Sequence, residues 1–161
     1  MGEPLFSCEC ETCRRACTVK PGWFMPGEAE ILAGNMNLAL QELFDNHLQV
    51  DFWASGDDSI FVLSPATTSG VRGAEFPFDA TGRCAFFVEG RCAVHTAGKP
   101  FECAMLSHDG AENRRHREVA DAWKAHQNQI TDLLGREPVV AEPDSGDLFS
   151  MLFGMLQRPG T

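Results

Sequence analysis

The sequence contains no run of about 20 apolar residues, the length that a helix needs to cross a bilayer. It also has no surplus of basic residues, because the formal net charge is −10 and the pI is about 4.8. An acidic surface repels phosphate backbones, so we expect no nucleic-acid partner. The first residues have neither the basic segment nor the apolar run of a secretory signal. We therefore expect a cytoplasmic protein without membrane association.

Tyrosine is absent, but 12 Phe and 3 Trp supply enough aromatic side chains for a core. A chain of 161 residues with 43% hydrophobic residues predicts a single domain, residues 1–161. Internal repeats and low-complexity tracts are absent. The glycine-rich strand-to-helix fingerprint of nucleotide-binding enzymes is also missing, because the pair Gly70 and Gly73 falls in an expected loop. The composition thus favours a small globular domain and assigns no catalytic residue.

Cysteine is present and unevenly distributed. All 7 cysteines lie in two windows, one of ten residues and one of twenty: Cys8, Cys10, Cys13 and Cys17, and then Cys84, Cys92 and Cys103. A reducing cytosol disfavours structural disulfides and leaves thiols available to metals, and an odd count does not suit a fully paired disulfide framework. Cysteines used only as small core residues would be scattered. We therefore expect the fold to bring both windows together around a metal.

The periodicity predicts a mainly α domain with short β-hairpins, that is, a small α+β fold. The expected core is the cysteine-cluster region, residues 6–106. Helices are predicted at 10–17, where three cysteines share one face, at 28–35 with Ile31 and Leu32 as the apolar face, and at 38–47. The segment Trp23–Met25 is too apolar for a free linker and is expected to fill the core beside the cluster.

Strands and later helices follow from shorter patterns. A hairpin is expected from 50–53 and 60–63, then a long loop over 64–82, and a second hairpin from 84–88 and 91–95. A helical turn is predicted at 99–103. A long helix is predicted within 111–135, ended by Gly135, and a last helix within 144–161. The apolar stripe of the long helix would be Val119, Trp123, Ile130 and Leu133 or Leu134.

The spacing of the first window leaves the metal undecided. Sulfurs around one zinc lie about 3.8 Å apart, whereas Cys10 and Cys17 on a regular helix are about 10 Å apart along its axis. Either the helix breaks, or the site is larger than one zinc ion, as in a multinuclear site or an iron–sulfur cluster. The common ferredoxin spacings are absent. Zinc and iron therefore both stay open as the bound metal.

Other residues near the cysteines have simpler roles. His95, which completes a C-x2-H spacing with Cys92, is more readily a structural histidine than a ligand. His108, five residues after Cys103, is a weaker candidate still, and His47, His116 and His126 are expected on helix faces. As ligands, Glu9, Glu11 and Glu102 are not needed. Basic side chains adjoin the cysteines and could stabilise thiolates: Arg14, Arg15, Arg83, Arg91 and Lys99.

These motifs resemble the YkgJ-type cysteine-cluster family, which is described as a zinc- or iron-chelating domain. The likeness covers roughly residues 6–106 and is most specific in the second window, Cys84-Ala85-Phe86, Gly90-Arg91-Cys92-Ala93-Val94-His95 and Lys99-Pro100-Phe101-Glu102-Cys103. The first window, C-x-C-x2-C-x3-C, departs from the C-x2-C-x2-C-C that is usual in that family, and Ala104 stands where Arg is common. The departures affect Cys8 most. The resemblance implies that Cys84, Cys92 and Cys103 are ligands.

Three functions remain open. The first is a metal-binding protein in which zinc or iron, alone or as an iron–sulfur cluster, joins the two windows. The second is a metal-dependent enzyme that modifies a protein, since the similar family includes flagellin lysine methylases that use S-adenosylmethionine. The third is an interaction module with a structural metal and a Phe- and Met-rich C-terminal helix for docking. The sequence identifies no particular protein partner.

Overall fold

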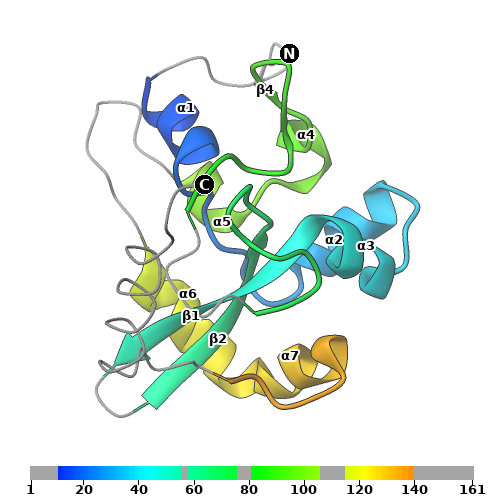
Figure 1. Ribbon diagram of the computed structural model, residues 1–161, viewed down its shortest axis with the longest axis vertical. Helices are drawn as coiled ribbons and strands as arrows, with labels where there is room; N and C mark the ends of the chain where they lie inside the picture. Colours follow the sequence, from blue (N-terminus) through cyan, green and yellow to red (C-terminus); the bar gives the residue numbers. More distant parts are fainter. Residues whose placement is uncertain (1–10, 56–57, 76–80, 106–114, 140–161) are drawn as a thin grey trace, which may run out of the picture.

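The computed structural model describes residues 11–55, 58–75, 81–105 and 115–139 of the chain (Figure 1). The elements follow in the order α1 (Glu11–Thr18), α2 (Glu28–Asn35), α3 (Leu40–His47), β1 (Leu48–Ser55), β2 (Asp58–Pro65), β3 (Phe87–Val88), β4 (Arg91–Cys92), α4 (His95–Gly98), α5 (Phe101–Ala104), α6 (His116–Trp123), the 3₁₀ turn η1 (Lys124–His126) and α7 (Gln127–Leu134). The protein is a small α+β fold, as the sequence predicts.

The antiparallel hairpin β1–β2 crosses the middle of the molecule (Figure 1). Its register places Val50 opposite Leu63 and Phe52 opposite Phe61. Helices α6 and α7 pack against β2, α3 packs against β1, and α2 packs against α3 and α4. Figure 1 shows α1, α4 and α5 together above the hairpin, at the end opposite to α7. The hairpin is therefore the scaffold that separates a cysteine-bearing end from the core helices.

The segment Trp23–Met25 fills the core, as expected from its composition. Trp23 and Phe24 are buried, and the Phe24 N–H donates to the carbonyl of Leu63 at 2.9 Å. The Phe24 carbonyl in turn accepts a hydrogen bond from the indole of Trp123 at 2.7 Å. This segment thus joins β2 to α6 through backbone polar groups that would otherwise be buried without a partner.

Helix α2 begins where the Pro26-Gly27 turn predicts it. Gly27 precedes the helix at φ 91°, a left-handed conformation that disfavours side chains with a Cβ. The Glu28 carboxylate accepts the N–H of Met25 at 2.7 Å and that of Phe101 at 2.9 Å. It therefore fixes both the entry to α2 and the start of α5. The prediction for Ile31 is wrong, since 62% of its surface is exposed and Leu32 with its neighbours Ala29 and Ala33 forms the buried face.

The predicted long helix is interrupted. Its apolar stripe is buried as expected, at Val119, Trp123, Ile130 and Leu133, but the 3₁₀ turn η1 separates α6 from α7. Gly135 ends α7 at φ 71°, and its N–H donates to the Thr131 carbonyl. The beginning of the predicted helix, before 115, and the C-terminal helix within 144–161 lie outside the described residues.

The second hairpin is shorter than predicted. Only Phe87–Val88 and Arg91–Cys92 pair as strands, because Glu89 and Gly90 turn the chain with positive φ. Cys84 instead forms an isolated antiparallel bridge with Thr67, and His95 begins α4. The same bridge holds the expected loop 64–82 at Thr67, and a parallel bridge with Val50 holds it at Glu75. None of the described helices is both long and apolar enough to span a bilayer.

Replacing Trp123 with Phe should destabilise the core through a lost hydrogen bond and through the void that the smaller ring leaves. The substitution leaves the buried Phe24 carbonyl without its donor, which costs about 1–3 kcal/mol. Urea unfolding of Trp123→Phe against the parent measures this free energy. Trp53→Phe, at a half-buried ring, is the matched control and should lose less. Equal losses in the two variants would contradict the assigned role of the Trp123 indole.

Candidate functional site

The two cysteine windows meet in space. The Cys84 N–H donates to the Cys17 carbonyl at 2.8 Å, which ties the second window directly to α1. Five cysteines from four parts of the chain line one cavity of about 40 Å³: Cys13, Cys17, Cys84, Cys92 and Cys103. The fold therefore brings together five of the residues that the sequence predicted as ligands. The other two, Cys8 and Cys10, lie outside the described residues.

Each cavity cysteine is held by a different local structure. Cys13 and Cys17 are one helical turn apart on α1, so their side chains share a face. Cys92 ends β4, and Cys103 lies in the short helix α5. Cys84 is placed by its bridge to Thr67. Because these elements are far apart in sequence, the cavity exists only in the folded chain.

Backbone amides act on three of the thiols. The Gly22 N–H donates to Cys103 Sγ at 3.2 Å. The backbone amides of Phe86 and Phe87 lower the pKa of Cys84, and that of Val94 lowers the pKa of Cys92. Donors aimed at sulfur stabilise the thiolate, which is the form that binds metals. This arrangement fits sulfur ligands oriented by backbone amides.

Burial has the opposite and larger effect on these thiols. It raises the pKa of Cys17 to about 11 and the pKa values of Cys84 and Cys103 to about 12, and it also raises that of Cys92. The neighbouring cysteines add to the increase, because thiolates so close together repel one another. Lys99 lowers the pKa values of Cys17 and Cys92 but does not cancel the burial. Four thiols in one cavity therefore stay protonated at neutral pH until a cation enters.

The described part of the cavity contains no ready-made site for a single metal ion. Among the described residues, no group of three or more His, Cys, Asp or Glu side chains is arranged to hold a single metal ion. This geometry bears on the choice between one zinc ion and a larger centre, because a single tetrahedral zinc needs its sulfurs about 3.8 Å apart.

The cations near the cysteines fall into two groups. Arg14, Arg91 and Lys99 line the cavity, and Lys99 Nζ lies 3.5 Å from Nδ1 of His95, which also lines it. Arg83 instead donates to the Phe87 carbonyl and lies over the Phe87 ring, and Arg15 faces a different hollow of the surface. Of the five basic residues next to cysteines in the sequence, three line the cysteine cavity and two, Arg15 and Arg83, do not.

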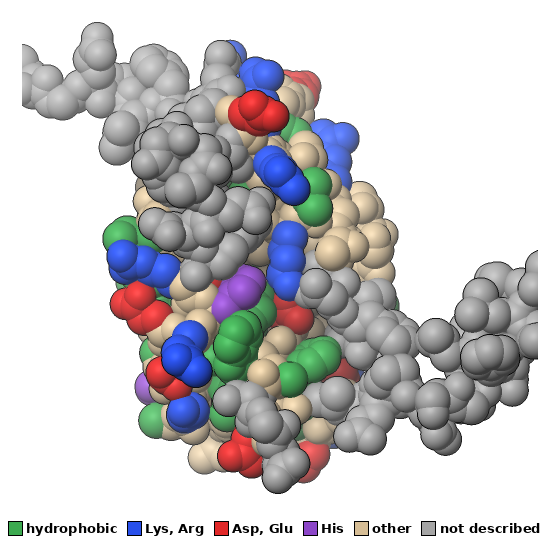
Figure 2. Space-filling view, turned by 90° about the vertical axis from the view of Figure 1, so that its left-hand side faces the viewer, with side chains coloured by type: hydrophobic (Ala, Val, Ile, Leu, Met, Phe, Trp, Pro, Cys, Tyr) green, Lys and Arg blue, Asp and Glu red, His purple; other side chains and the backbone are tan. Residues whose placement is uncertain are grey.

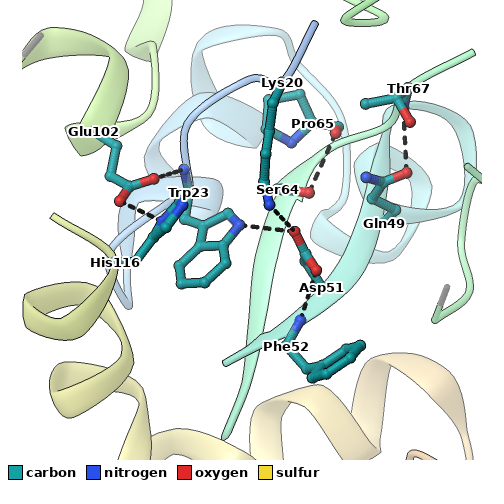
Figure 3. A network of polar contacts seen from close by, with 10 residues as sticks. All are labelled: Lys20, Trp23, Gln49, Asp51, Phe52, Ser64, Pro65, Thr67, Glu102 and His116. Atoms are coloured by element: carbon teal, nitrogen blue, oxygen red, sulfur yellow. Dashed lines mark hydrogen bonds and ion pairs between the residues drawn. The ribbon is translucent and has the colours of Figure 1, made fainter. Parts of the chain in front are cut away.

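A polar network beside the cavity was not predicted (Figure 3). Glu102 is only 1% exposed, accepts the Trp23 N–H at 2.8 Å, and places Oε1 2.7 Å from Nδ1 of His116. The His116 ring is tilted by 30° against the Trp23 ring, with the centroids 3.8 Å apart. On the other side, the Trp23 indole donates to Asp51 at 2.9 Å. No sequence pattern pairs Glu102 with His116. The position of Glu102 between the apolar residues Phe101 and Cys103 was the one signal that its carboxylate is buried.

Consecutive amides of one segment join this network to the cavity. Gly22 donates to Cys103 and Trp23 donates to Glu102, so residues 22–23 lie against residues 102–103. A Cβ on Gly22 would come within 2.6 Å of Glu102 Cβ and 2.7 Å of Cys103 N. Only glycine permits this approach.

No protein-family model, curated protein or solved structure matches this chain.

Gly22→Ala should displace residues 102–103 from the segment 22–23. Overpacking of this kind costs about 1–3 kcal/mol, measured as the change in the free energy of urea unfolding. Gly34→Ala is the matched control, since nothing lies within 4 Å of a Cβ at this position in α2, and it should stabilise by about 0.5–1 kcal/mol. The close approach at Gly22 would be refuted by Gly22→Ala protein as stable as the parent.

The metal-free, reduced protein should lose stability in alkali. Thiols of the unfolded chain have a pKa of about 8.5. Burial raises the pKa values of Cys84 and Cys103 in the folded protein to about 12. Over that interval the unfolded chain binds fewer protons, so the free energy of unfolding falls as pH rises. Urea unfolding at about pH 7.5, 9 and 10 measures the slope. Cys103→Ala should reduce the slope; an unchanged slope would show that the titration belongs to other groups.

Proposed function

We propose that the protein binds a metal centre between its two cysteine windows, with zinc or iron as the metal. The observation that carries the proposal is that one cavity is lined by five cysteines, Cys13, Cys17, Cys84, Cys92 and Cys103. Seven cysteines confined to two windows, five of them facing one cavity, are more than a core needs. The resemblance to YkgJ-type proteins supports the same function by analogy.

The described cysteines suit such a centre chemically. Backbone amides lower the pKa values of these thiols, whereas burial and the neighbouring cysteines raise them by more. Without a metal, the thiols therefore keep their protons. A cation reverses this balance, because it attracts every thiolate at once and its binding releases their protons. Cys17, Cys84, Cys92 and Cys103 would hold the centre, with Cys13 and Cys10 completing it and Cys8 as the weakest member.

Five cysteines line the cavity, one more than the four that a single zinc ion binds, which favours a larger centre. In an iron–sulfur cluster the thiolates are distributed over several irons, so they need not all meet at one ion. A centre of this kind would join the windows and could be structural, carried or redox-active. We assign no catalytic residue to it.

Anaerobic purification, metal and sulfide analysis and a visible spectrum test the proposal. Iron with sulfide and broad absorbance near about 400 nm is expected for a cluster; a colourless protein with stoichiometric zinc would support the single-metal form. Cys84→Ser and Cys103→Ser should each lose bound metal. Cys8→Ser changes the weakest member of the centre and should lose the least metal. Folded parent protein that stays metal-free after incubation with both metals would overturn the proposal.

A further inference from the structure

The cysteine cavity carries a charge opposite to that of the whole protein. Although the chain has a formal net charge of −10, the described lining of the cavity contains the cations Arg14, Arg91 and Lys99 and no carboxylate. Figure 2 shows Lys and Arg side chains gathered toward the upper end of one face, the end at which Figure 1 places α1 and α4. The proposed metal centre would therefore occupy a positively charged cavity in an acidic protein.

Lys99 is the most sheltered of these three cations. Arg14 and Arg91 are exposed, whereas Lys99 is half-buried. Water and salt screen an exposed charge, but they screen a partly buried charge much less. The Lys99 ammonium is therefore the cation whose charge acts most strongly inside the cavity.

The backbone and one neighbour hold Lys99 in place. Pro100 follows it and restricts it to extended backbone, which Lys99 adopts at φ −66° and ψ 150°. Its Nζ lies 3.5 Å from Nδ1 of His95, four residues earlier in the chain. In the described part of the chain, no ion pair joins Lys99 to a carboxylate. A neutral imidazole does not cancel the charge of an ammonium, so this charge remains available to the cavity.

Lys99 acts on both cysteine windows. It lowers the pKa of Cys17 in the first window and the pKa of Cys92 in the second. The ammonium thus favours the thiolate form of both side chains. Metal binding creates this form, and a divalent ion with four thiolates keeps an excess of negative charge. A fixed cation beside the filled site compensates part of that excess.

We propose that Lys99 is a charge-compensating residue of the metal centre, which it stabilises through Cys17 and Cys92. The inference rests on the proposed metal centre and extends it to a residue that is not a ligand. In the metal-free protein the cysteines are protonated, so Lys99 has no negative charge to compensate there. Its stabilising effect therefore belongs to the metal-bound state.

Cobalt titration tests this role in the reduced, metal-free, full-length protein, with Co²⁺ as a coloured substitute for zinc. Competition with a chelator measures the affinity, and the thiolate-to-cobalt absorbance reports the ligands. Lys99→Gln should weaken Co²⁺ binding about ten-fold with the same absorbance band, because one nearby compensating charge is lost. Lys99→Arg should keep the affinity of the parent, because it retains the charge.

Two controls separate the charge of Lys99 from other causes. Lys124→Gln removes the same charge from an exposed lysine outside the cavity, which pairs with Asp121, and should bind Co²⁺ as the parent does. Urea unfolding of metal-free Lys99→Gln should match that of the parent, whereas a merely structural lysine would lower this stability when replaced. If Lys99→Gln does not fold, Lys99→Met takes its place.

A parent protein that carries an iron–sulfur cluster is tested by its midpoint potential. Lys99→Gln should lower this potential, because the reduced cluster has one more negative charge, and Lys99→Arg should restore it. Unchanged affinity and potential in Lys99→Gln, or equal losses in Lys124→Gln, would overturn the role of Lys99 and leave the metal centre standing. A parent that takes up neither Co²⁺ nor a cluster would overturn the metal centre, and the role of Lys99 with it.

Discussion

The arrangement of the cysteine cavity and of the polar network around Trp23 depends on the close approach of residues 22–23 to residues 102–103. Two successive backbone amides make this contact, one to the Cys103 sulfur and one to the Glu102 carboxylate. Backbone donors cannot rotate away as side chains can, so a single segment fixes a thiol and a carboxylate at once. The contact requires glycine at position 22, because the space for a Cβ is occupied by Glu102 and Cys103. One of these two amides thus faces the cysteine cavity, and the next one faces the polar network around Trp23.

The cysteine cavity and the polar network around Trp23 differ in how their buried acidic groups are compensated. In the cysteine cavity, several acidic groups are gathered where water is scarce, and burial keeps their protons bound until a cation compensates. In the polar network around Trp23, the buried carboxylates are each compensated within the fold: Asp51 by Lys20 and the Trp23 indole, and Glu102 by His116. The cysteine cavity therefore calls for positive charge from outside, whereas the polar network contains its own counter-charges.

Several features were predictable from local sequence because their causes are local. The Pro-Gly turn before Glu28, the stop at Gly135 and the buried stripe of Val119, Trp123 and Ile130 follow from backbone conformation and helical periodicity. Errors arose where tertiary packing overrides these rules. The 3₁₀ turn at 124–126 and the exposure of Ile31 cannot be read from the pattern, because both depend on which face of a helix meets the hairpin.

The sequence by itself determined the chemistry that is available: two windows of thiols, no basic surplus, and an apolar segment at Trp23–Met25 able to occupy the core. Only the tertiary structure decided which groups meet. It placed Cys17 beside Cys84, separated Arg15 and Arg83 from the cysteine cavity, and paired Glu102 of α5 with His116 of α6. The physical reason is that composition and periodicity describe neighbours along the chain, whereas burial, thiol pKa values and ion pairs depend on neighbours in space.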